Sequence, residues 1–119
     1  MNEELSKKQG ESDSYFSDID LLRKEIDIAG DKVSCEPTLQ NFKVFRELLS
    51  KLMKQISTEA YKLEKYGGTP QNPRYFEVIS IINSEADQLY KLIVCQQKEN
   101  MAITAKVIGI KGLVVDLIT

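Results

Sequence analysis

The sequence contains no histidine among its 119 residues. This absence removes every Ser-His-Asp or Cys-His arrangement, in which an imidazole acts as the base, and argues against a zinc site. The neighbouring carboxylates Asp18 and Asp20, and likewise Glu85 and Asp87, are two positions apart and face different sides of a helix. We therefore predict a protein that is not an enzyme and that has no catalytic residues, no metal site and no cofactor.

Cysteine is scarce, with Cys35 and Cys95 only, and the two form no recognisable motif. Cys95 lies within a helical pattern, so we predict a small buried side chain, with one disulfide as the alternative. Residues 1–10 are polar and charged, without the apolar stretch of a secretory signal. A reducing cytoplasmic location is the favoured prediction.

The sequence has neither a strong net charge nor an apolar segment long enough to span a membrane. Sixteen basic residues against eighteen acidic ones give a net charge of −2, which imposes no overall field for a nucleic acid or a membrane. The most apolar segment, residues 103–118, is shorter than the usual span and is interrupted by Lys106, Lys111 and Asp116. We predict no membrane association.

Helix-breaking residues are few and occur in two clusters. Residues 34–37 and residues 67–73 hold all three prolines, so they are predicted to be connectors. Thr38 follows Pro37 and is a good N-cap for a second helix over residues 39–65, although position 41 is Asn instead of the Glu or Gln of a capping box. We predict a disordered polar tail at 1–14 and a single helical domain at 15–119.

The last 45 residues carry the strongest helical pattern. Their apolar spacing of three and four is typical of a helix with one buried stripe. We favour one continuous helix over residues 75–119, with a turn at 96–100, and so a fourth helix, as the alternative. A β-hairpin around Lys111 and Gly112 is a further alternative, because the flanking residues are β-branched. The predicted fold is all-α: an antiparallel helical bundle of three helices, or four with that turn, ending in a long C-terminal helix.

The exposed side of the second helix is rich in lysine, with Glu47 among the basic residues. Such a surface could contact an acidic protein or a phosphate backbone, or simply keep an amphipathic helix in water. No interleaved aromatic residues or arginine cluster favour base stacking. The candidate partner-binding residues are Lys43, Lys51, Lys54, Lys62 and Lys65.

Residues 103–118 are apolar nearly all around the helix, which indicates burial on several sides. An oligomer interface and the core of the chain itself both explain this pattern. Gly109 and Gly112 are predicted to allow close backbone packing, so that Gly112→Ala would destabilise the protein. The candidate self-association residues are Ile103, Val107, Ile110, Val114 and Leu117.

From about residue 17 onward the chain resembles the YaaR-like family of small, uncharacterised bacterial proteins. The resemblance rests on residues 24–27, 37–39 and 45–49, and above all on the run at 108–117. It implies an all-α cytoplasmic protein, and it supplies no known activity and no catalytic residues.

Together these patterns predict a helical binding or scaffold module that self-associates. The expected assembly is a homo-oligomer, and any other protein partner has no signature in the sequence. The alternative is an accessory nucleic-acid-binding protein that uses the lysine-rich side of the second helix.

Overall fold

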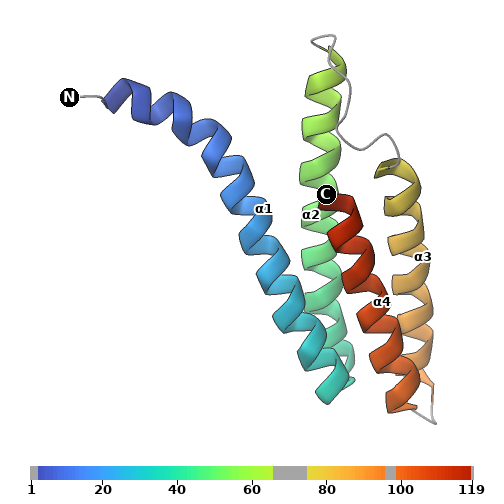
Figure 1. Ribbon diagram of the computed structural model, residues 1–119. Helices are drawn as coiled ribbons and strands as arrows, with labels where there is room; N and C mark the ends of the chain where they lie inside the picture. The colour runs from blue at the N-terminus through green and yellow to red at the C-terminus, as the bar shows by residue number, and fades with distance from the viewer. Residues whose placement is uncertain (1–2, 66–74, 96–98, 119) are drawn as a thin grey trace.

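The computed structural model consists of four α-helices joined in antiparallel succession (Figure 1). The helices are α1 Glu3–Cys35, α2 Leu39–Lys65, α3 Tyr75–Val94 and α4 Asn100–Ile118. The structure describes residues 3–65, 75–95 and 99–118, with side chains except at 3–16 and 60–65. No strand occurs within these ranges, so the predicted all-α bundle is confirmed and the hairpin alternative is excluded.

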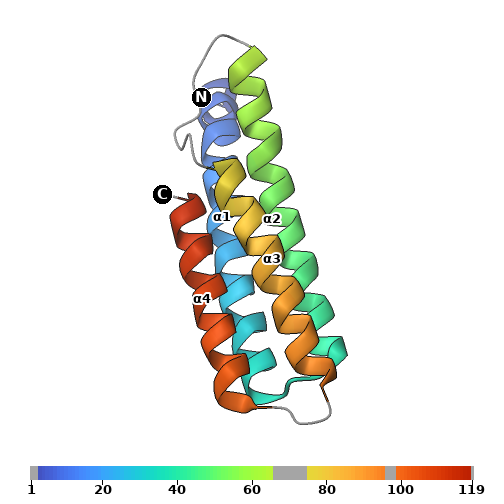
Figure 2. The ribbon, with the colours of Figure 1, turned by 90° about the vertical axis from the view of Figure 1, so that its right-hand side faces the viewer.

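The helices form a closed ring of neighbours. α1 packs against α2 and α4, and α3 packs against α2 and α4, whereas the backbones of the two diagonal pairs stay apart over the described residues. Figures 1 and 2 show the chain running down α1, up α2, down α3 and up α4. Each helix therefore turns one side to the common core and keeps an opposite side outward.

The predicted cap at Thr38 is confirmed. The backbone N–H of Asn41 donates to the Thr38 hydroxyl at 3.2 Å, and the Asn41 side-chain amide donates to the Glu36 carbonyl at 2.9 Å. Asn41 thus satisfies a carbonyl in the connector, while Thr38 satisfies one of the first N–H groups of α2. These bonds fix the sharp turn between α1 and α2.

The core is entirely apolar over the described side chains. No polar or charged residue is buried there, and the central side chains Phe45, Ile82 and Ile110 have no exposed surface. Each helix contributes residues at spacings of three and four, which place them on one side of the helix. The buried cluster comprises Ile19, Ile26, Ala29, Val33, Phe42, Phe45, Leu49, Leu52, Met53, Tyr75, Val78, Ile82, Leu89, Ile93, Ile103, Val107, Ile110, Val114 and Leu117.

The favoured prediction of one continuous C-terminal helix is wrong. α3 ends at Val94, α4 begins at Asn100, and the two helices pack against each other. A single straight helix would separate its two apolar halves by tens of ångströms, whereas folding back buries both against the same core. The alternative of a fourth helix is the correct one, and the predicted turn falls partly on residues 96–98, outside the described residues.

α1 is longer than predicted. It begins at Glu3 instead of near residue 15, and it ends at Cys35, inside the predicted connector at 34–37. The early residues include good helix formers and no proline, which allows the helix to extend. Because the side chains of residues 3–16 are not described, a separate polar tail stays a prediction.

Gly30 lies inside α1, at a point where neighbouring side chains leave no room for a Cβ. A Cβ at this position would lie 2.7 Å from Cε of Lys111, 3.0 Å from Cγ1 of Val107 and 3.2 Å from Cε1 of Phe45. The missing side chain lets α4 approach α1 and lets Lys111 cross its surface.

Candidate functional site

The outward side of α4 is the most distinctive surface of the molecule. Its exposed residues repeat at spacings of four and three, as in a coiled-coil stripe. Large side chains occupy 101, 108 and 115, and small ones occupy 105 and 112. We call this set the outward seam of α4: Met101, Ala105, Ile108, Gly112 and Val115.

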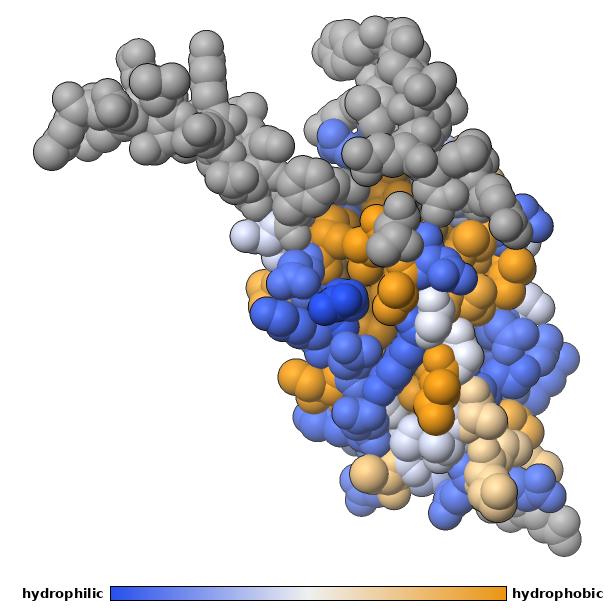
Figure 3. Space-filling model, viewed as in Figure 1, coloured by the Kyte–Doolittle hydropathy of each residue, from blue (hydrophilic) through white to orange (hydrophobic). Residues whose placement is uncertain are grey.

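The outward seam is apolar although it faces solvent. Met101 is 87% exposed, Ile108 63% and Val115 44%. In Figure 3, hydrophobic side chains gather along the middle of the visible face, over α4, between more hydrophilic surfaces of α1 and α3. Contiguous apolar patches of this kind typically mark interaction sites.

The lysines of α4 lie at the borders of the seam and contact neighbouring helices. Nζ of Lys106 is 2.7 Å from the Glu85 carboxylate and also donates to Oε1 of Gln88 at 2.7 Å. Nζ of Lys111 is 2.6 Å from the Asp31 carboxylate. Each border therefore carries a neutralised ion pair, one toward α3 and one toward α1, and neither lysine covers the seam.

The five predicted self-association residues lie on the opposite side of α4. Ile103, Val107, Ile110, Val114 and Leu117 are each at most 3% exposed, in the core of the chain itself. Their predicted role as interface residues is wrong, because the core of the bundle already covers them. The sequence signal for the outward seam is a second apolar stripe, on the opposite side of the same helix.

Gly109 and Gly112 do not pack closely within the chain. A Cβ at either position would meet no atom within 4 Å, and both residues are exposed. No other described part of the chain therefore makes the predicted close contact, and close packing at these glycines stays a prediction for a contact with another chain. The two glycines instead leave a shallow, open strip of backbone on the outward side of α4.

The lysine-rich side of α2 is exposed as predicted, over the part that is described. Lys43, Lys51 and Lys54 are exposed and form no ion pair with any described residue, and no ion pair joins Glu47 to Lys51. The side chains of Lys62 and Lys65 fall outside the described residues.

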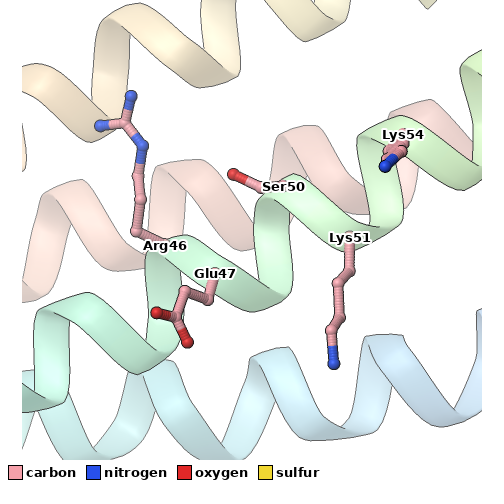
Figure 4. Close-up of a pocket in the computed structure, with 5 residues that line it drawn as sticks. All are labelled: Arg46, Glu47, Ser50, Lys51 and Lys54. Carbon is pink, nitrogen blue, oxygen red and sulfur yellow. The ribbon is translucent and has the colours of Figure 1, made fainter.

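An open groove of about 310 Å³ lies on α2 within this surface. Figure 4 shows that Arg46 points toward α3, whereas Glu47 and Lys51 point toward α1. Arg46 donates to Asp87 of α3 at 2.9 Å, so its charge is already matched. The lining residues diverge instead of converging on one point: Arg46, Glu47, Ser50, Lys51 and Lys54.

The described residues hold no group of three or more Cys, Asp or Glu side chains arranged for a metal ion. Cys35 and Cys95 are free thiols, and both are exposed. The predicted burial of Cys95 is wrong, because α3 ends one residue earlier, at Val94.

The fold and its surfaces define a small antiparallel four-helix bundle with an apolar outward seam. The chain belongs to a family of proteins of unknown function, DUF327, which matches residues 2–118. The predicted resemblance to the YaaR-like family is thereby confirmed.

One solved structure, the crystal structure of an uncharacterized protein from Bacillus halodurans, is similar over 100% of this chain and 98% of its own. The TM-score is 0.77 and the sequence identity 18%, so the similarity concerns the fold. No functionally curated protein matches the chain. No helix within the described part of the chain is long and apolar enough to cross a membrane.

Proposed function

We propose that the protein is a non-enzymatic helical binding module that acts in the cytoplasm and associates through the outward seam of α4. The observation that carries this proposal is the exposure of Met101, Ile108 and Val115 on a side of α4 that bears no basic residue. A helix that only covered a core would gain nothing from apolar residues on its solvent side. Two exposed free thiols are consistent with a reducing compartment.

The experiment is sedimentation velocity of the purified protein at roughly 200 µM, a concentration that populates a weak complex. We expect the wild type to sediment as an associated species and the Ile108→Asp variant to lose this association, because a charge would be buried at the contact. Lys54→Asp is the matched control, since it places the same carboxylate on an exposed position of α2. Equal association of both variants, or a monomeric wild type at this concentration, would remove the proposal.

A second candidate function is polyanion binding by α2. The exposed Lys51 and Lys54, which have no acidic partner among the described residues, favour it. Binding through lysines releases counterions, so the affinity for nucleic acid should fall steeply with salt and should weaken further in a Lys51→Gln, Lys54→Gln double variant. A gel shift that detects no complex at low salt would eliminate this candidate.

A further inference from the structure

The alternation of size along the outward seam gives it a self-complementary shape. Large residues repeat every seven positions at Met101, Ile108 and Val115, and small ones repeat every seven at Ala105 and Gly112. In a coiled coil each projecting side chain inserts between residues of the facing helix, so large residues pack best opposite small ones. One helix with both kinds of position can therefore supply both partners of a contact.

We propose that the seam binds a second copy of the chain, with the two α4 helices antiparallel. The two-fold axis runs between the helices, perpendicular to them, at the level of residue 110. This arrangement rests on the proposed function and specifies its partner. In this register Ile108 lies against Gly112 of the second copy, and Val115 lies against Ala105 of the second copy. A parallel pair would instead set large against large and small against small, leaving gaps between the small positions.

The charges at the borders of the seam fit a second copy. Lys111 is paired with Asp31 at 2.6 Å and Lys106 with Glu85 at 2.7 Å, so each lysine of α4 already has a carboxylate partner. The two-fold axis brings the Lys111 borders of the two copies together, where each lysine arrives with its own carboxylate. The remaining charged residue of α4, Asp116, is exposed beside Gly112, and the antiparallel arrangement sets the two copies of Asp116 about 18 Å apart along the helix axis, so they repel each other little.

Gly109 and Gly112 allow the two helices to approach closely. Both are exposed, and their Cα atoms have open space where a Cβ would lie. Near the two-fold axis the only side chain that projects strongly is Ile108, which has the strip of glycine backbone opposite it. Close approach increases van der Waals contact along the pair and fixes the register.

The size of α4 sets the expected strength. Its 19 residues span about 28 Å, and a helix is about 10–12 Å wide. One such side covers on the order of 300 Å², compared with about 800 Å² per partner in a standard interface. We therefore expect a dissociation constant in the micromolar range or weaker. Experiments then need roughly 200 µM protein to populate the dimer.

Cysteine cross-linking in a Cys35→Ser, Cys95→Ser background tests the register. In the antiparallel pair, positions 105 and 115 face each other across the interface, whereas each lies about 15 Å along the helix axis from its own equivalent. A disulfide needs Cα atoms within about 7 Å. Mild oxidation of the Ala105→Cys, Val115→Cys double variant should therefore give at least tenfold more linked dimer than either single variant.

Each outcome decides a separate point. Efficient linking of the single variants would indicate a parallel pair and overturn the register. If no variant links although the same proteins sediment as dimers, the two copies meet through another face and the inference fails. If the proteins remain monomeric throughout, self-association itself fails.

Discussion

At the residue scale, the decisive glycine is Gly30 and not the pair in α4. It is buried where α1, α2 and α4 meet, and three side chains crowd the position that a Cβ would occupy. Two of these contacts, with Val107 and Phe45, involve core side chains that have little room to move. The third is the flexible end of Lys111, which can shift more easily.

We expect Gly30→Ala to lower the free energy of unfolding by about 1–3 kcal/mol, because overpacking exceeds the gain of about 1 kcal/mol in helix propensity. Gly109→Ala is the matched control, since nothing lies within 4 Å of its Cβ position. It should raise the stability of the separate protomer by up to about 1 kcal/mol. Denaturant unfolding at low protein concentration measures both, and a more stable Gly30→Ala variant would contradict the packing described here.

The ion pair between Glu85 and Lys106 is the best sheltered one among the described residues, with side chains 28% and 24% exposed. We expect Glu85→Gln to cost about 1 kcal/mol or less, because water still screens the pair and Lys106 keeps its bond to Gln88. A double-mutant cycle with Lys106→Met isolates the coupling, which should shrink in high salt. A coupling unaffected by salt would show that the contact is not electrostatic.

At the scale of the helix, the orientation of α4 about its axis places Ile108 and Ile110, the two residues that flank Gly109, in opposite environments. Ile110 is fully buried, whereas Ile108 is 63% exposed. We expect Ile110→Ala to reduce the free energy of unfolding by about 2–5 kcal/mol, since it opens a cavity in the core. Ile108→Ala should change protomer stability by less than about 0.5 kcal/mol. Similar losses in the two variants, measured by chemical denaturation of dilute protein, would mean that the helix is rotated differently.

The start of α2 offers a matched pair of threonines. Thr38 accepts a hydrogen bond from the N–H of Asn41, whereas the hydroxyl of Thr58 donates to the Lys54 carbonyl, which the helix can satisfy by itself. Thr38→Ala should cost about 1 kcal/mol, and Thr58→Ala should be neutral or slightly stabilising, because alanine is the better helix former. Thermal melts decide it, and an equal loss in both would argue against the capping role.

The sequence predicted the second helix and its cap because their signals are local. The spacing also predicted one buried stripe along residues 75–119, although its residues on α4 were assigned to a self-association interface. The break between α3 and α4 was not the favoured prediction, because Gln, Lys and Glu near residues 96–99 suit a helix as well as a turn. Which stripe of α4 faces inward depends on where α1 and α3 lie, and a single sequence does not contain that information.

At the scale of the whole molecule, the ring of four helices covers the inward apolar stripe of each helix. α4 also carries a second apolar stripe, which faces outward. On α1 the exposed Leu21 and Ile28 are interspersed with charged residues such as Lys24 and Glu25, so they are isolated, which is ordinary for a protein surface. On α3 the exposed Tyr90 and Val94 lie one turn apart, but they form a short pair. The outward seam of α4 differs because it continues over four turns without a basic residue.

Sedimentation equilibrium of the wild type and of Ile108→Asp, at concentrations from about 10 µM to about 1 mM, tests this claim most directly. We expect the mass of the wild type to rise from 13.5 kDa toward twice that value, while the variant stays at 13.5 kDa. A wild type that remains at 13.5 kDa over the whole range, or a variant that associates equally well, would contradict the claim.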